Sequence, residues 1–139
     1  ISIRDTSVRK DRKENFYHGI LLGLLSHRED WILVSNAESG DGYSDILVEI
    51  EEESIGIVIE VKYPDSGKKS PDGADASINR AKSCNVKSPY EMMEKGCREA
   101  LQQIEDIGYE EKLRQDGLET ILKYGIACNR KKCRVMLED

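Results

Sequence analysis

Apolar residues near the beginning of the chain recur every three or four positions between about residues 13 and 26, which is the spacing of one side of a helix. Two adjoining rows of apolar residues carry this spacing. They are Phe16, Ile20 and Leu24 in one row and Tyr17, Leu21 and Leu25 in the other. The pattern predicts a first helix that packs against the rest of the domain.

Three segments with the pattern of β-strands come next, and short turns separate them. The strands are predicted over residues 30–36, 44–50 and 55–63, with a glycine-containing turn at 38–42 and a tight acidic hairpin turn at 51–54. Glycines permit the positive φ angles that such turns require. The three strands are therefore expected to form an antiparallel meander.

The third of these strands differs from the others because it is apolar on both faces. Alternation along a strand puts Ile57 and Ile59 on one face and Val58, Glu60 and Lys62 on the other. Apolar residues on both faces are typical of a central strand that other elements cover. We therefore expect this strand in the middle of the sheet.

The second half of the chain begins with a polar segment, residues 64–87, which we expect to be a long loop. A helix start signal follows, in which Ser88 is the N-cap, Pro89 occupies the first helical position and Glu91 completes a capping box. The apolar stripe of this helix comprises Met93, Cys97, Ala100, Leu101, Ile104 and Ile107. Beyond it the pattern predicts a short helix at 109–115 and strands at 118–128 and 134–137, joined by a basic turn.

The predicted order is helix, three strands, helices, then two strands, which indicates an α/β domain with helices packed on a sheet. A chain of 139 residues is the size of one domain with a real core. We expect residues 1–139 to form that single domain, with residues 1–12 as a lead-in. Because the sequence opens with Ile1 instead of Met, we expect it to be a fragment of a longer protein.

Composition and charge narrow the class of protein. Hydrophobic residues make up 38% of the chain and charged residues 35%, and the net charge is −6. We find no apolar run long enough to span a membrane and no signal peptide, so we expect no membrane partner and a cytoplasmic location. A passive nucleic-acid binder is usually basic, so the negative charge counts against that role more than against a metal-dependent enzyme.

Four cysteines, Cys84, Cys97, Cys128 and Cys133, are expected to be free thiols, as in a reducing compartment. The paired C-x2-C spacing of a zinc site is absent. Cys128 and Cys133 are five residues apart across the last predicted hairpin. A disulfide, a metal site or a redox role for these two residues therefore stays open as an alternative.

The residues that suggest chemistry lie at one end of the predicted meander. Pairing of the second and third strands around the acidic turn places Asp45 roughly opposite Glu60. Two carboxylates in that relation repel unless a cation bridges them, and an oxygen-rich site suits Mg²⁺ or Mn²⁺. Lys62 then lies beside the metal, where a phosphate would sit. The alternative is that Glu60 and Lys62 form an ordinary ion pair at a strand end.

Two further residues could belong to this site. Glu14 lines up with Leu21 and Leu25 on the first helix, so it is expected to face inward, although an acid in a first turn is also favoured by the helix dipole. Gln103 lies at the edge of the apolar stripe of its helix, whereas Gln102 points away from it. The alternative for Gln103 is an ordinary boundary residue.

Asp45, followed by a hydrophobic strand that carries Glu60-Val61-Lys62, resembles the core of the PD-(D/E)XK nuclease superfamily. The likeness is closest to the branch that forms the C-terminal domain of bacterial and archaeal AAA-ATPase-like proteins. The segments that resemble that branch begin at Glu14, Ser35, Asp45, Ile59, Ala100 and Lys123 and together extend over most of the chain. The Glu-x-Lys triplet alone is a weak motif, and the ordered set of six is much stronger.

The resemblance implies a restriction-endonuclease-like fold, in which a mixed central β-sheet is flanked by helices, and a mechanism. Asp45, Glu60 and the main-chain carbonyl of Val61 would hold Mg²⁺ or Mn²⁺, and the metal would activate water for phosphodiester cleavage. Lys62 would orient that water and offset charge on the phosphate. Glu14 would assist through metal-bound water, and Gln103 would position Lys62 or the phosphate.

The resemblance also implies partners, and two features depart from it. DNA is the expected nucleic acid, RNA less so, and an ATPase region would lie in a missing N-terminal part, because no Walker A motif is present. Tyr43 and Ser44 stand where the branch often has Arg, and the 64–87 loop is long. These departures and the negative charge favour an alternative: a nuclease-fold module that cuts nothing and binds nucleic acid or a protein for an attached ATPase.

Overall fold

The computed structural model describes residues 10–38, 43–64 and 88–138 of the chain. These ranges leave out all of the expected 64–87 loop except Pro64, with Cys84 in it, most of the glycine turn at 38–42 and residues 1–9 of the lead-in. Within them, no helix is long and apolar enough to cross a membrane. The described part of the chain is one α/β arrangement.

Three helices, five strands and one short 3-10 turn make up the described residues, close to the predicted pattern. Their bounds are α1 Lys10–Leu25, β1 Ile32–Glu38, β2 Tyr43–Ile50, the 3-10 turn Glu51–Glu53, β3 Ile55–Lys62, α2 Pro89–Ile107, α3 Tyr109–Gln115, β4 Thr120–Asn129 and β5 Lys132–Glu138. The first helix begins three residues before its predicted start. The last strand is longer than predicted, because it pairs with β4 along its whole length.

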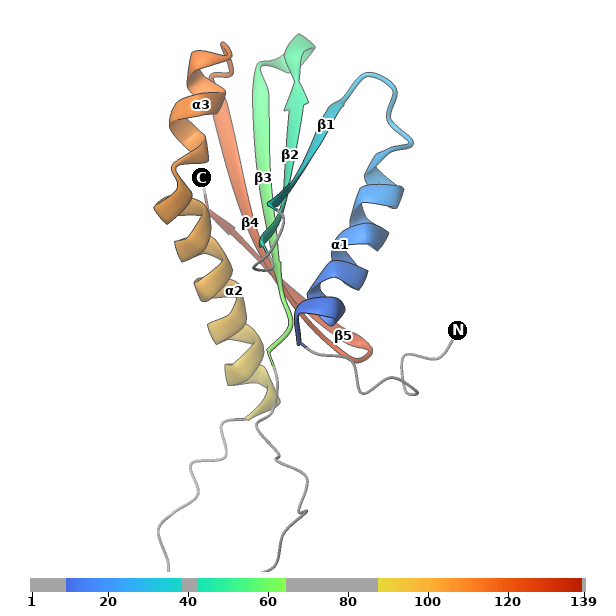
Figure 1. The fold of residues 1–139 in the computed structure, drawn as a ribbon. Helices are drawn as coiled ribbons and strands as arrows, with labels where there is room; N and C mark the ends of the chain where they lie inside the picture. Colours follow the sequence, from blue (N-terminus) through green and yellow to red (C-terminus); the bar gives the residue numbers. More distant parts are fainter. Residues whose placement is uncertain (1–9, 39–42, 65–87, 139) are drawn as a thin grey trace, which may run out of the picture.

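The five strands form one mixed sheet in the order β1-β2-β3-β4-β5, with β3 in the centre as the sequence predicted. Strands β1, β2 and β3 form the expected antiparallel meander, and β3 pairs in parallel with β4. A parallel neighbour requires a crossover connection, and α2 and α3 lie in the segment that makes it. Helix α1 lies against one face of this sheet, and α2 and α3 lie against the other (Figure 1).

Helix α1 buries one of its two apolar rows and leaves the other in solvent. Tyr17, Leu21 and Leu25 pack against the sheet, whereas Phe16, Ile20 and Leu24 are 45%, 44% and 64% exposed. Of the two rows, the one with Tyr17 therefore faces the core and the one with Phe16 faces solvent. A single helix lying across a sheet touches it along a narrow strip, so only one row fits beneath it.

Helix α2 begins with the predicted capping box. The Ser88 hydroxyl accepts a hydrogen bond from the Glu91 N–H, and the Glu91 carboxylate accepts one from the Ser88 N–H. Its apolar stripe then packs on the sheet, where Leu101 and Ile104 join Val58 in a buried cluster. A cap of this kind stabilises a helix by about 1 kcal/mol, so the local sequence determines where α2 begins. Burial of the apolar stripe determines which face of α2 is turned toward the sheet.

The three described cysteines are free thiols, as predicted. Cys128 and Cys133 are register partners across the β4–β5 hairpin, and the Cys133 thiol is directed at the Cys128 sulfur at 2.8 Å. Burial raises the pKa of the Cys128 thiol, and the neighbouring Cys133 raises it further. A raised pKa keeps Cys128 protonated and weakly reactive, which does not favour the redox alternative.

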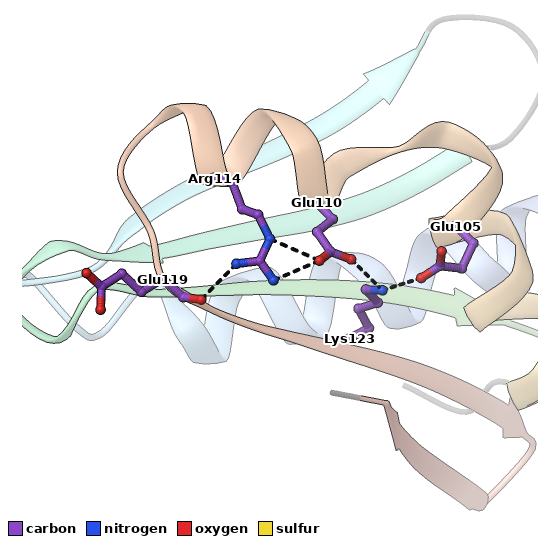
Figure 2. A network of polar contacts seen from close by, with 5 residues as sticks. All are labelled: Glu105, Glu110, Arg114, Glu119 and Lys123. Carbon is purple, nitrogen blue, oxygen red and sulfur yellow. Dashed lines mark hydrogen bonds and ion pairs between the residues drawn. The ribbon is translucent and has the colours of Figure 1, made fainter.

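A network of charged side chains ties α2 and α3 to the sheet (Figure 2). Lys123 of β4 is 7% exposed and contacts the carboxylates of Glu105 on α2 and Glu110 on α3, the latter at 2.9 Å. Arg114 donates to the same Glu110 carboxylate and to the main-chain oxygen of Glu119. The hydrogen bond with Glu105 raises the pKa of Lys123, and Lys123 lowers the pKa of Glu110. These contacts hold α3 in place relative to α2 and β4.

Helix α2 lies very close to the sheet at Gly125 of β4. A Cβ placed there would lie 2.4 Å from the main-chain oxygen of Cys97 and 2.9 Å from Cγ of Leu101. The first of these atoms belongs to a helix backbone and has little room to move. Only glycine therefore lets α2 lie this close to β4.

We predict that Gly125→Ala lowers the free energy of unfolding by about 3 kcal/mol, because the added methyl group forces α2 away from the strand. Gly19→Ala is the matched control, since a Cβ at this exposed helical position meets nothing within 4 Å. Alanine there should stabilise the protein by about 0.5–1 kcal/mol. Chemical denaturation of both variants tests this, and similar effects of the two substitutions would contradict it.

Candidate functional site

Two carboxylates face each other in the interior of the sheet. Asp45, near the start of β2, is the register partner of Glu60, near the end of β3, as the sequence predicted. Both side chains are fully buried. They continue the rows of Leu47 and Val58, which pack beneath α2 and α3, so the hydrophobic core itself fixes which face the carboxylates occupy.

Three of the four carboxylate oxygens in this pair have no hydrogen-bond partner among the described residues. They are Oδ1 of Asp45 and both oxygens of Glu60. Oδ2 of Asp45 accepts a hydrogen bond of 2.5 Å from the Tyr109 hydroxyl. Buried oxygens without partners are costly, so this arrangement favours a cation between the two groups.

Burial raises the pKa of the Asp45 carboxyl above its ordinary value. The Tyr109 hydrogen bond opposes this rise in pKa, as do the charges of Lys62 and His18. Desolvation is the strongest of these effects, so the fold holds Asp45 in a place where its negative charge is unfavourable until a positive charge compensates it.

Lys62 lies between Glu60 and Gln103. Its ammonium group is 3.0 Å from Oε1 of Glu60, a distance for an ion pair, although the geometry is not that of a hydrogen bond. The same ammonium donates a hydrogen bond to Oε1 of Gln103 on α2. Gln103 thus contacts Lys62, as the sequence suggested, while Gln102 is exposed. The Nε2 atom of Gln103 is buried without a described partner.

Helix α1 contributes Glu14 and His18 from the other face of the sheet. Glu14 is 6% exposed and accepts a hydrogen bond of 3.0 Å from the main-chain N–H of Tyr63, the residue after Lys62. Its inward orientation is as predicted. His18, one turn further along, is also buried, and its Nε2 is 2.8 Å from Oγ of Ser35 on β1.

A divalent metal fits this donor set in part. Within the described ranges no three His, Cys, Asp or Glu side chains come together as a ready-made cluster. Mg²⁺ does not require one, because it is often held by one or two carboxylates with waters and phosphate oxygens as the remaining ligands. Asp45 and Glu60 are suited to be those carboxylates. The carbonyl of Val61 as a further ligand stays a prediction.

Tyr109 and His18 were not assigned to the site from the sequence. Glu14 and His18 are four residues apart and therefore share a side of α1, which is a signal that could have indicated His18. Tyr109 offers no such signal. It reaches Asp45 because α2 ends at Gly108, whose φ of 76° turns the chain into α3 above the carboxylates.

Comparison with known families gives one match, to the family model described as PD-(D/E)XK nuclease superfamily, over residues 12–138. The match includes every described residue of the site. No curated protein and no solved structure matches the chain.

We predict that Asp45→Asn makes the metal-free protein more stable at pH 7 by about 1 kcal/mol, because it removes a buried charge that faces Glu60. The raised pKa of Asp45 sets the pH dependence. Stability from a raised carboxyl pKa is present at low pH and is lost as the pH rises through that pKa. The gain should therefore vanish below about pH 4, where Asp45 is itself neutral.

Denaturation curves in chelator at several pH values measure this gain. Asp30→Asn is the control, because Asp30 is an exposed acid paired with Arg28. Its effect should stay within about 0.5 kcal/mol. Destabilisation by Asp45→Asn at pH 7 would contradict the view that the carboxylate pair is strained.

We predict that Tyr109→Phe destabilises the protein by about 1.5–3 kcal/mol at pH 7, because it removes a donor to a buried carboxylate. In the Asp45→Asn background the same change should cost about half as much, since the acceptor is then neutral. A double-mutant cycle by chemical denaturation measures the difference. Equal losses in both backgrounds would show that Tyr109 acts by packing alone.

Proposed function

The chain belongs to the PD-(D/E)XK nuclease superfamily, and from this premise we propose that it is a metal-dependent nuclease that hydrolyses phosphodiester bonds in DNA with Mg²⁺ or Mn²⁺. The observation that carries the proposal is the buried pair Asp45 and Glu60, in which three of the four carboxylate oxygens accept no hydrogen bond from the described residues. Two like charges buried opposite each other are unfavourable, so their presence in the core favours a role that requires them.

Asp45 and Glu60 would hold the ion from adjacent strands. When bound, a divalent ion supplies positive charge that polarises a phosphate and lowers the pKa of a water. The Tyr109 hydroxyl occupies Oδ2 of Asp45 and leaves Oδ1 as the oxygen for the ion. Tyr109 would thus orient the carboxylate without contacting substrate.

Lys62 would carry the positive charge that faces the phosphate. Its side chain is 16% exposed, so it lies at the boundary between the buried carboxylates and solvent. Gln103 accepts its hydrogen bond and limits where the ammonium can point. A positive charge held near a developing negative charge stabilises a transition state. Gln103 would contribute by holding the Lys62 ammonium group in position.

Glu14 would act from α1, beside the end of β3. Its hydrogen bond to the Tyr63 N–H holds the main chain directly after Lys62. We propose that it also contacts water near the ion. His18 stands one turn away, and its charge favours ionised Asp45 by lowering the Asp45 pKa.

We extend the proposal to the partner of the chain and to its location in the cell. The six ordered segments support membership of the branch that is attached to AAA-type ATPases, and we propose such a region as the partner. Free thiols support action in the cytoplasm. The net charge of −6 supports the alternative, a nuclease-fold module that binds nucleic acid or a protein partner without cutting.

We predict that Mg²⁺ or Mn²⁺ binds the wild-type chain and that Asp45→Asn and Glu60→Gln each weaken binding about ten-fold or more, because each removes a charged ligand. Isothermal calorimetry measures binding, and plasmid cleavage is followed on the same samples. Glu52→Gln, an exposed acid in the turn before β3, is the matched control and should bind like wild type. Absence of metal binding by the wild type would end the nuclease proposal.

The same samples separate the two functions. Lys62→Met should keep metal binding within a few-fold and lower cleavage about 100-fold or more, because Lys62 acts on the phosphate. Gln103→Ala should lower cleavage less, and Gln102→Ala, its exposed neighbour, should leave cleavage unchanged. Metal binding without cleavage of DNA or RNA would favour the binding module.

A further inference from the structure

Strand β5 forms one edge of the sheet, and apolar side chains along it are exposed. Within the described part of the chain its one sheet neighbour is β4, and the seven residues Lys132–Glu138 pair with β4 without a bulge. Val135 and Leu137 are each 54% exposed. Proteins commonly protect an edge with a bulge, a proline, a very short strand or charged side chains, and of these β5 has only charged side chains.

The outer side of β5 offers backbone groups at alternate residues. The register of Asn129 with Lys132 leaves a two-residue turn, and a hairpin of this kind closes on a hydrogen-bonded pair. The backbone groups of Lys132 therefore point toward β4. By alternation, those of Cys133, Val135 and Leu137 point outward, where a further strand could pair with them.

The order of charges along β5 is self-complementary. Lys132 begins the strand, Glu138 ends it, and Val135 is its midpoint. In an antiparallel pair of two β5 strands centred on Val135, each Lys132 lies opposite the Glu138 of the other strand. Cys133 lies opposite Leu137, and the two Val135 residues face each other. This register pairs all seven residues and uses the three outward-pointing positions as its hydrogen-bonded pairs.

We propose that two copies of this chain associate through antiparallel pairing of their β5 strands, with a two-fold axis at Val135. A closed, two-fold arrangement is the most common form of homo-oligomer. The apolar side chains of Val135 and Leu137 from both copies then lie on one face, and the two Lys132–Glu138 pairs stabilise the ends. Arg134 needs no partner across the axis, because it contacts Tyr90 and Glu94 of its own α2.

The opposite edge of the sheet does not have this property. An antiparallel pair of two β1 strands, Ile32–Glu38, centred on Ser35 would place Ile32 opposite Glu38, an apolar residue against a charge. Charge order therefore distinguishes β5 from β1 as the edge that fits a second copy. Cross-strand pairs of opposite charge are favourable and like charges directly opposite are unfavourable, so β5 selects both its partner and the register.

The dimer orients the two copies in a defined way. The turn between β4 and β5 is at the same end of the sheet as Pro64, whose carbonyl accepts a hydrogen bond of 2.6 Å from the Asn129 side chain. That is the end at which Glu60 and Lys62 lie. Reversal of β5 across the axis places the two candidate sites at opposite ends of one continuous sheet, so each would act on its own substrate.

The association should be weak, because strand pairing along one edge buries less area than a standard protein interface. Sedimentation velocity of the 139-residue chain, from roughly 1 µM to 1 mM and with reductant present, measures it. Val135→Lys puts two ammonium groups at the axis and should weaken the dimer about ten-fold or more. Because Val135 is half exposed, the variant should fold, which circular dichroism checks.

Charge exchange gives the sharpest test. Lys132→Glu alone and Glu138→Lys alone each create two like-charge pairs and should weaken the dimer about five- to ten-fold. The double variant Lys132→Glu with Glu138→Lys restores opposite charges and should recover association to within about two-fold of wild type. Recovery of this kind depends on direct pairing and does not follow from a change in net charge.

Leu24→Glu is the matched control, because Leu24 is an exposed apolar residue on α1, 64% accessible, outside the proposed interface. It should leave the dissociation constant unchanged. A chain that is monomeric at every concentration overturns the proposal. So does a dimer that Leu24→Glu abolishes while Val135→Lys does not, or one that the charge-exchange double variant fails to restore.

Discussion

The structure depends on the burial of two carboxylates opposite each other in the centre of a sheet. Asp45 and Glu60 are register partners with no exposed surface, and only one of their four oxygens accepts a hydrogen bond from the described residues. Two buried carboxylates with the Lys62 ammonium as their one close positive charge among the described residues are unfavourable for folding. Extensive packing elsewhere has to hold them, including the core beneath α2, the close contact at Gly125 and the charged network at Lys123.

That network also links stability to the site. Lys123 holds α2 and α3 together from β4, and α3 begins with Tyr109, whose hydroxyl reaches Asp45. Lys123 and its two carboxylate partners therefore help to position the helix whose first residue, Tyr109, contacts Oδ2 of Asp45.

Features that a local sequence pattern determines could be predicted from the sequence. The tight turn before Ile55 sets the register of β2 and β3, so the position of Asp45 opposite Glu60 could be predicted. The capping box at Ser88 set the start of α2. In contrast, α1 has two apolar rows of similar character, and which row is buried depends on how the helix lies across the sheet. Tyr109 could not be placed, because its position depends on the length of α2 and the turn at Gly108.

The connection between β3 and β4 has a consequence for how the protein reaches its native state. The chain leaves β3 at Lys62 and returns to pair with it at Thr120, so the parallel pair joins residues far apart in sequence. Contacts of such separation form slowly, since a long loop must close before they are made. The candidate site needs α1, β2, β3, α2 and α3 together, so it is complete only when these long-range contacts have formed. A ligand that requires the complete site would bind only the finished fold and would protect it from unfolding.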